Sequence, residues 1–157
     1  KKKLLETNPY ANISIYNKKI TKNKLNLLKS SSIVIDATDD WTTMKLINKY
    51  CLGNNIPLLS SSAVGYNTQI VLFENHNDKH LCLNCLFPNE SEPELARCET
   101  VGILGTVAGL AGIISAQKTI NFLMEFKNNN NFHTLIDSKT LSVNQIKIDK
   151  NINCKLL

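Results

Sequence analysis

The sequence is poor in the features that mark several large classes of protein. It has one arginine and one tryptophan among 157 residues, and aromatic side chains make up 6%. Its other basic residues are lysines spread along the chain, and the only basic run is 1–3. Nucleic-acid surfaces usually gather basic and aromatic side chains on one face. We therefore expect no nucleic-acid partner, despite a net charge of +5.

Long apolar runs and an apolar leader are also missing. The longest apolar run, 101–115, is shorter than the about 20 residues that a bilayer-spanning helix needs, so we expect no membrane contact. The five cysteines are an odd number, and no apolar leader precedes them. This combination predicts a reducing, cytoplasmic compartment, where cysteines serve metal sites or catalysis more often than disulfides.

The sequence does contain an alternation of short apolar strands and helical patterns. Ser31–Ala37 and Ile56–Ser62 read as buried strands, and Trp41–Leu52 between them has apolar residues at helical spacing. This order predicts a βαβ unit, and continuous apolar strands suit a parallel sheet covered on both faces. We expect one α/β domain over 1–157 with a twisted, mostly parallel sheet. Further predicted strands are Ala11–Tyr16, Tyr66–Glu74 and a terminal hairpin of Phe132–Asp137 and Leu141–Ile148.

A long apolar helix is predicted from about Val101 to Phe126. Four glycines within it, at 102, 105, 109 and 112, fall along one helical face. Such a face would let the helix backbone approach another element closely, at a propensity cost of ~1 kcal/mol per glycine. The spacing is not that of a phosphate-binding loop, because no G-x-G-x-x-G follows a strand and no G-K-[ST] is present.

Asp36 and Asp39 stand where the first buried strand ends. Ligands of open α/β sheets bind beyond the carboxyl ends of the strands, and carboxylates there can hold Mg²⁺ against the phosphates of a nucleotide. Both residues are therefore candidates for cofactor binding. A structural role is equally open, because an aspartate at this point also caps the following helix.

The cysteines offer two further candidate sites. Cys82 and Cys85 form a C-x-x-C pair, whose open alternatives are a metal site, a redox pair or no role, and Cys154 could add a third sulfur. His80 or His133 could complete such a site. Cys98 follows Arg97 and precedes a helix, which is a setting that favours a thiolate nucleophile, although an idle loop cysteine fits too. Cys51, on an apolar helical face, reads as a core residue.

Taken together, several short motifs in one order resemble the ThiF/MoeB/HesA family, the bacterial relatives of ubiquitin-activating enzymes. These enzymes adenylate the C-terminal glycine of small sulfur-carrier proteins. The motifs are Asn8-Pro9, IDATDD (35–40), Asn48 with Cys51, Ile56-Pro57, SSAVGYNTQ (61–69), CLNCLFP (82–88), EPELARC ending at Cys98, and VGILG (101–105). The SAVG segment and the Glu92-Pro93 pair are more similar to ThiF than to MoeB.

The resemblance implies a Rossmann-like fold and an enzyme that uses ATP and Mg²⁺. It implies a ThiS- or MoaD-like ubiquitin-like carrier as partner, a role in thiamine or molybdopterin biosynthesis, and a homodimer. Asp39 matches the aspartate that binds Mg²⁺ and supports adenylation, and Cys98 the cysteine that links to the carrier or its sulfur. Cys82, Cys85 and Cys154 match three ligands of a structural Zn²⁺.

The same comparison shows where the sequence departs from the family. The glycine-rich nucleotide loop and the first βαβ unit are expected to precede Lys1, so the chain matches the C-terminal portion of the fold. Leu157 stands at the fourth zinc cysteine, Met44 at an arginine, Asp40 at an asparagine and Thr106 at a proline. We thus expect weak zinc binding unless a histidine or water is the fourth ligand. The alternative function is a truncated or split, non-catalytic half that binds the carrier or a complementary N-terminal subunit; a zinc-stabilised structural domain is a third.

Overall fold

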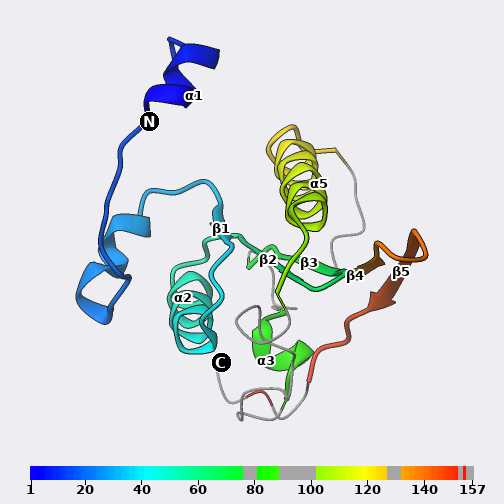
Figure 1. The fold of residues 1–157 in the computed structure, drawn as a ribbon. Coiled ribbons are helices and arrows are strands. Elements are labelled where there is room, and N and C mark those ends of the chain that lie inside the picture. The colour runs from blue at the N-terminus through cyan, green and yellow to red at the C-terminus, as the bar shows by residue number, and fades with distance from the viewer. Residues whose placement is uncertain (76–80, 89–101, 127–131, 152–153, 155–157) are drawn as a thin grey trace.

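The computed structural model describes residues 1–75, 81–88, 102–126, 132–151 and 154. Its centre is a five-stranded sheet whose spatial order follows the chain, β1-β2-β3-β4-β5 (Figure 1). Helix α2 covers one face, and helix α5 lies over the other. The bounds are α1 Lys2–Thr7, 3-10 helix η1 Lys22–Leu28, β1 Val34–Asp36, α2 Trp41–Gly53, β2 Leu58–Val64, β3 Asn67–Phe73, α3 Leu83–Leu86, α5 Gly105–Leu123, β4 Phe132–Asp137 and β5 Ser142–Lys147.

The α/β class is confirmed, but the expectation of a mostly parallel sheet is wrong for the described strands. Only β1 and β2 run parallel among them, and the other three pairings are antiparallel. The reason is connection length. Parallel neighbours need a crossover such as α2, whereas β2 and β3 are joined by Gly65 and Tyr66 alone, in a tight turn where Gly65 adopts a φ of 57°.

The α2 side of the sheet holds the larger core. Alternate residues of the strands, including Val34, Leu58 and Phe73, pack there against Ile47 and Cys51 of α2. Cys51 is completely buried, and burial raises the pKa of its thiol to about 12, so it is the core residue that its spacing predicted. Trp41 closes one end of this layer by packing edge-on against Phe87, with 5.5 Å between ring centroids.

The α5 side is covered less completely. Leu59, Ile70 and Leu72 are buried there beneath Ile114 and Phe122 of α5. The predicted helix is confirmed from Gly105 onward, but Gly102 lies before it with a φ of 75°. The expected close approach to the glycine face is wrong within the described chain. A Cβ added at any of the four glycines at 102, 105, 109 and 112 would meet no atom within 4 Å, because only the opposite face of α5 packs on the sheet.

The N-terminal residues form an arm that stands away from the sheet (Figure 1). The predicted strand Ala11–Tyr16 is wrong, since this segment has no regular structure, and Tyr10, Ile15 and Tyr16 are largely exposed. An alternating segment becomes a strand only when a neighbouring strand pairs with its backbone. None of the described residues supplies such a neighbour.

The terminal hairpin formed by β4 and β5 is confirmed. All six β5 residues are exposed, yet Ile148 directly after it is buried in the core on the α2 side. That residue anchors the returning chain and leads it to Cys154. Within the described ranges, no helix is both long and apolar enough to cross a bilayer.

Candidate functional site

Asp39 lies on the turn between β1 and α2, and it is not the residue that caps α2. The α2 N-cap is Asp40, whose carboxylate accepts hydrogen bonds from the backbone N–H and the hydroxyl of Thr43. Those bonds, led by the hydroxyl, lower the pKa of Asp40, and Lys19 lies 3.6 Å from its Oδ2. Asp39 itself is exposed and makes no hydrogen bond or ion pair with the described residues. Its carboxylate is thus left for other chemistry.

Asp36 occupies a different environment. As a neighbour of Ile35 in an extended strand it points to the opposite face, where it is 1% exposed. Its Oδ1 accepts hydrogen bonds from the Thr38 backbone N–H at 3.0 Å and hydroxyl at 2.7 Å. Burial raises the pKa of this carboxyl, against the lowering effect of the Thr38 bonds. Asp36 shapes the turn that carries Asp39 and is not among the residues that line the adjoining hollow.

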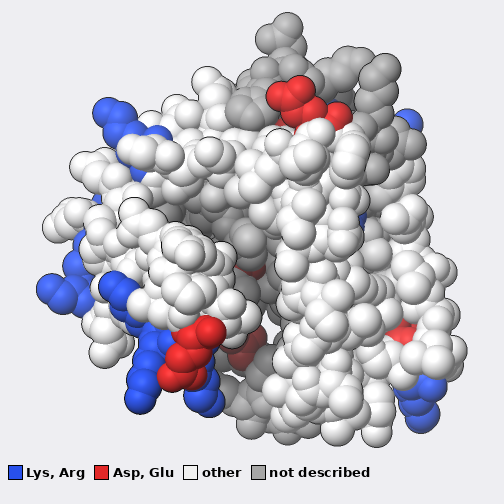
Figure 2. Space-filling view, turned by 90° about the horizontal axis from the view of Figure 1, so that it is seen from above, with Lys and Arg blue, Asp and Glu red and all other residues white. Residues whose placement is uncertain are grey.

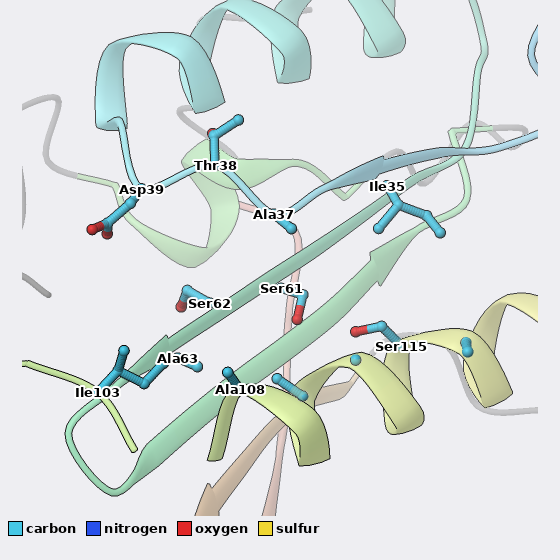
Figure 3. Close-up of a pocket in the computed structure, with 13 residues that line it drawn as sticks. Ile35, Ala37, Thr38, Asp39, Ser61, Ser62, Ala63, Ile103, Ala108 and Ser115 are labelled. Carbon is cyan, nitrogen blue, oxygen red and sulfur yellow. The ribbon is translucent and has the colours of Figure 1, made fainter. Parts of the chain in front are cut away.

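Asp39 stands at the rim of a hollow of about 420 Å³ between the end of β1 and α5 (Figure 3). The lining is mostly small and apolar, and Asp39 is the one charged residue in it among the described part of the chain. From above, the molecule shows a hollow with largely uncharged walls (Figure 2). The lining residues are Ile35, Ala37, Thr38, Asp39, Ser61, Ser62, Ala63, Ile103, Ala108, Ala111, Gly112, Ser115 and Ala116.

Three lining serines carry polar groups that the sequence analysis did not single out. Ser61 and Ser62 lie in the middle of β2, just beyond the end of β1, because the last residue of β1, Asp36, pairs with Ser60. Their place in a predicted βαβ unit could have identified them. Ser115 is 5% exposed, its hydroxyl has no hydrogen-bond partner among the described residues, and it points from α5 toward Ser61 (Figure 3). The feature of the sequence that could have identified Ser115 is its position as a single serine on the apolar face of the predicted helix.

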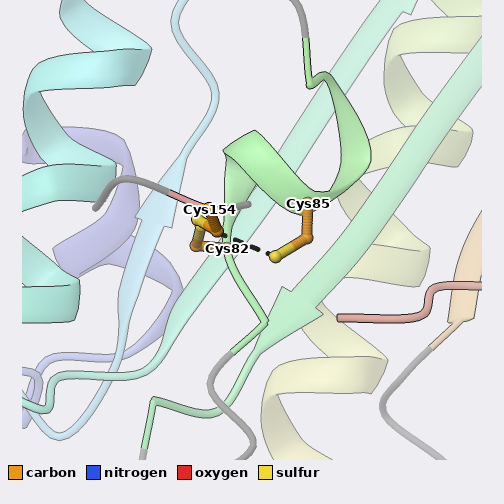
Figure 4. A group of neighbouring side chains, drawn as sticks. All are labelled: Cys82, Cys85 and Cys154. Atoms are coloured by element: carbon orange, nitrogen blue, oxygen red, sulfur yellow. Dashed lines mark hydrogen bonds between the residues drawn. The ribbon is translucent and has the colours of Figure 1, made fainter. Parts of the chain in front are cut away.

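The structure brings Cys82, Cys85 and Cys154 together on the far side of the sheet (Figure 4). The Cys82 sulfur lies 3.9 Å from that of Cys85 and 3.5 Å from that of Cys154. A tetrahedral zinc with bonds of ~2.3 Å places its sulfur ligands about 3.8 Å apart. Two of the three sulfur–sulfur distances are therefore close to the edge of a zinc tetrahedron, and all three sulfurs lie within 4.8 Å of one another.

The electrostatics of the cluster also suit a cation. Burial first, then the neighbouring Cys85 and Cys154 sulfurs, raise the pKa of the Cys82 thiol to about 12. Without positive charge nearby this sulfur stays protonated, and a divalent cation supplies the charge that stabilises a thiolate. No histidine, carboxylate or further cysteine joins the three within the described residues, and His133 lies buried in β4 apart from them.

Local structure holds the cluster in place from both ends of the chain. Cys82 precedes the short helix α3, and the buried Asn48 of α2 accepts a hydrogen bond from the Leu83 N–H at 3.0 Å. This bond ties the C-x-x-C turn to the core. The sulfurs of Cys82 and Cys85 then meet Cys154, brought by the chain that Ile148 anchors.

Four residues considered for the candidate sites lie outside the described residues, as do the motif residues Glu92 and Pro93 and the predicted helix start Val101. The four are His80, Arg97, Cys98 and Leu157. The segment that contains Arg97 and Cys98 ends just before Gly102, whose carbonyl accepts a hydrogen bond from the Gly65 N–H at 2.9 Å. Gly102 therefore lies at the β2–β3 turn, and Ile103 after it lines the hollow.

Comparison with known proteins follows this geometry. The chain is 31% identical over 122 residues to the sulfur carrier protein ThiS adenylyltransferase of Escherichia coli (strain K12), covering 77% of this chain and 48% of that protein. It is 35% identical over 123 residues to the adenylyltransferase and sulfurtransferase MOCS3 of Culex quinquefasciatus, covering 77% and 28%. The chain thus spans half or less of the length of these relatives.

Solved structures agree on the fold. The crystal structure of E. coli MccB with ATP superposes with a TM-score of 0.78 at 18% identity, covering 99% of this chain and 48% of that one. The model of the ThiF family matches residues 1–156. The motifs that suggested this family carry both the aspartate at the hollow and the cysteine cluster, and the chain belongs to the ThiF family.

Proposed function

We propose that this chain is part of an ATP-dependent adenylyltransferase that activates the C-terminal glycine of a ubiquitin-like, ThiS- or MoaD-like sulfur carrier in the cytoplasm. Two relatives are named as adenylyltransferases, and one of them acts on ThiS. The observation that carries the proposal is Asp39. It projects at the carboxyl end of β1, beside the serine-lined hollow, and has no capping duty.

In the reaction, a carboxylate oxygen of the carrier attacks the α-phosphorus of ATP. A mixed carboxylic–phosphoric anhydride, the acyl adenylate, forms and the bond from the α-phosphorus to pyrophosphate breaks, so a poor acyl donor becomes a reactive one. Mg²⁺, when bound, offsets the negative charge of the phosphates during this exchange. Asp39 is the residue of this chain that would hold it, since an exposed, unpaired carboxylate is a suitable ligand.

The cysteines take two separate parts in this proposal. Cys82, Cys85 and Cys154 would hold a structural Zn²⁺, because their sulfur spacing already fits. Cys98 would handle the sulfur after adenylation: once a sulfane-sulfur donor has made it a persulfide, its outer sulfur would attack the acyl adenylate and release AMP, and a reducing thiol would then cleave the resulting acyl disulfide to give the carrier thiocarboxylate. Replacing it (Cys98→Ser) should preserve adenylation but abolish sulfur transfer in a reconstituted assay, and unchanged transfer would remove this role.

The second candidate function is that of a non-catalytic half-protein. It would bind the carrier or a complementary N-terminal subunit, and it would not adenylate the carrier by itself. The lining of the hollow includes no lysine or arginine among the described residues, so none of those side chains offers phosphates a positive charge. The sequence has a single arginine and no phosphate-binding loop. The proposed homodimer, as in the family, would not replace those groups, because each copy lacks them equally.

The decisive experiment is ATP–pyrophosphate exchange in the presence of a ThiS-type carrier. It uses the 157-residue chain by itself and a fusion that joins it to the half of the E. coli ThiS adenylyltransferase outside the matched region. We expect exchange by the fusion and none by the chain. Exchange by the chain itself would contradict the half-protein, and absence from both would contradict the adenylyltransferase.

The role of Asp39 is tested in the active fusion. Asp39→Asn should lower the exchange rate by about 100-fold or more, because one charged contact to the reacting phosphates is lost. Asp149→Asn is the matched control, since Asp149 is exposed and paired only across 4.0 Å with Lys147. Equal rates for the two variants would rule out Asp39 as the Mg²⁺ ligand.

A further inference from the structure

The short helix α3 contacts α2 at two points. The buried Asn48 of α2 accepts a hydrogen bond from the Leu83 N–H at 3.0 Å, and Trp41, the first residue of α2, packs edge-on against Phe87 with 5.5 Å between the ring centroids. Positions 41 and 48 are two helical turns apart, so both contacts fall on one face of α2. The segment 83–87 therefore spans about 10 Å of α2, from its middle to its first residue.

The same segment carries two of the three clustered cysteines. Cys82 is the N-cap of α3, and Cys85 lies within that helix. The Cys85 N–H donates to the Cys82 carbonyl at 2.9 Å, and the Phe87 N–H donates to the Leu83 carbonyl at 2.8 Å. These bonds join the cysteines and Phe87 in one compact turn, so a movement of the two sulfurs also moves the phenylalanine ring.

This turn depends on contacts outside it. A helix of four residues is not stable by itself, because its first turn fixes several residues for a single hydrogen bond. The Cys82 thiol, whose pKa is raised to about 12 by burial, meets the sulfurs of Cys85 and Cys154 at 3.9 and 3.5 Å, and neutral thiols form only weak hydrogen bonds. A divalent cation would replace these weak contacts with metal–thiolate bonds and hold the turn in place.

The other end of the segment adjoins Asp39. Asp39 is exposed and lies two residues before Trp41, so the position of its carboxylate depends on its neighbours in the chain. The turn before it is closed by hydrogen bonds to Asp36. After it, Asp40 caps α2 and Trp41 packs against the core on the α2 side. Trp41 is thus the large side chain that fastens this end of the turn to the core.

The orientation of the Trp41 ring depends on packing. Its Nε1 is buried and has no hydrogen-bond partner among the described residues. Lys45 Nζ lies over the ring, 5.7 Å from the centroid, and Phe87 meets the ring at an interplanar angle of 87°. Edge-on aromatic pairs are favourable beyond the area that they bury. Loss of Phe87 from this place would therefore free the ring and the turn before it.

We propose that Phe87 and Trp41 are positioning residues that couple the cysteine cluster to Asp39. With a metal on the cysteines, Phe87 stays docked on Trp41, and the turn that carries Asp39 is held in one place. Without the metal, α3 loosens, Phe87 leaves Trp41, and Asp39 becomes a poorer ligand for Mg²⁺. This inference rests on the proposed function for the role of Asp39. Because coupling is reciprocal, Mg²⁺ and nucleotide at Asp39 should also help to retain the metal at the cysteines.

The first test reads Trp41 directly, because it is the only tryptophan of the 157 residues. Zn²⁺ is added to the metal-free chain, and zinc content, far-UV circular dichroism and tryptophan fluorescence are recorded. We expect zinc to shift the emission to shorter wavelengths and to reduce quenching by acrylamide, since the docked ring loses contact with water. Bound zinc without such a shift would overturn the proposal, as would a chain that binds no zinc.

Three variants separate docking from folding in this test. Phe87→Leu should bind as much zinc as the unaltered chain but lose most of the shift, whereas Phe87→Tyr keeps the ring and should retain it. Phe73→Leu is the matched control, because it makes the same change in the same core at a residue that is not paired with Trp41. A shift that survives in Phe87→Leu, as folding of the whole chain on metal binding would give, would overturn the proposal.

The second test follows exchange against Mg²⁺ concentration in the active fusion. Phe87→Leu should raise the Mg²⁺ concentration for half-maximal exchange by about fivefold, the lower end of ordinary coupling, with little change in the rate at saturating Mg²⁺. Phe87→Tyr and Phe73→Leu should leave it unchanged. The same Mg²⁺ dependence in all three variants would overturn the link to Asp39. A fusion without any exchange would contradict the proposed function, and the zinc-dependent emission of Trp41 would then still decide whether the cluster is coupled to α2.

Discussion

The two faces of the sheet are covered by packed side chains to different degrees. On the α2 side, ten buried residues from strands, helix and the returning C-terminal segment form one core, which the three cysteines adjoin. On the α5 side, three buried residues pack under the helix, and the rest of the face opens into the hollow. Neighbouring residues of one strand show the contrast, because Val34 is 7% exposed and Ile35 is 48% exposed.

We infer from this difference that one face of the sheet mainly stabilises the fold and that the other carries the functional site. The α2 side can be completed by residues of this chain and a metal ion, so it should hold the fold together. The α5 side presents the edge of β1 that no described strand pairs with, the exposed glycines of α5 and Asp39, so it is where binding and chemistry should take place. Changes on the first face should lower stability, and changes on the second should alter function with little loss of stability.

Removing a metal ion from the cysteine cluster should cause the largest loss of folding stability. This loss should arise entirely on the α2 side of the sheet. With zinc at about a thousand times its dissociation constant, a site present only in the folded state stabilises it by about 4 kcal/mol. We expect chelation to remove this stability in urea titrations, and Cys82→Ser to remove bound zinc in elemental analysis. Cys51→Ala is the control, because Cys51 is buried outside the cluster. Equal zinc in both variants would disprove the site.

A matched pair of truncations compares the two faces directly. Leu58→Ala removes a side chain that is 1% exposed in the α2-side core and should cost about 3 kcal/mol of unfolding free energy. Ile35→Ala on the adjacent strand should cost about 1 kcal/mol or less, because that side chain is half exposed. In the fusion with the complementary half, the Ile35→Ala cost should rise. A cost that stays the same would mean that Ile35 remains uncovered.

Two adjacent aspartates offer a finer comparison. Asp40→Ala removes the α2 N-cap and should lower the melting temperature by a few degrees. Asp39→Ala should leave the melting temperature unchanged, since Asp39 caps nothing. Differential scanning calorimetry of both variants would check this. A larger fall in melting temperature for Asp39→Ala than for Asp40→Ala would show that Asp39, and not Asp40, has the structural role at the start of α2.

The smallest effect should be a pH dependence from His133. Burial lowers the pKa of this histidine below 6.5, so the folded state binds its proton less readily than the unfolded chain does. Stability is then full above pH 6.5 and falls as the pH drops through that value toward the folded-state pKa. Urea midpoints between pH 7.5 and 5 should show this slope, and His133→Gln should reduce it. The same slope in the variant would assign it to other groups.

The sequence was informative where structure depends on local pattern. The apolar run ending at Asp36, the helix after it and the terminal hairpin were all predicted, since period and turn residues define them. The sequence was uninformative where the structure of a segment depends on contacts with residues far away in the chain or on how the strands are connected. Ala11–Tyr16 has the alternation of a strand but none of the described residues to pair with, and the two-residue β2–β3 link makes the sheet mostly antiparallel.

The site residues divide in the same way. That three cysteines meet was predictable from the family motifs, whereas the roles of Asp36 and Asp39 depended on which face each side chain took. Strand alternation turns Asp36 into the core with Val34, and the capping by Asp40 frees Asp39. The sequence could mark Ser115 as a polar residue on an apolar helix face but could not place it at the hollow, because the hollow forms only when α5 lies across β2.

The joining of Cys82 to Cys154 has a consequence for how the protein is made. The two residues are 72 positions apart in the sequence. Closing a loop of that length removes about 4 kcal/mol of conformational freedom from the unfolded chain in the chain-entropy account. On the ribosome the cysteine cluster can therefore assemble only after Cys154 has emerged. A polypeptide released before that point would carry Cys82 and Cys85 without the third sulfur.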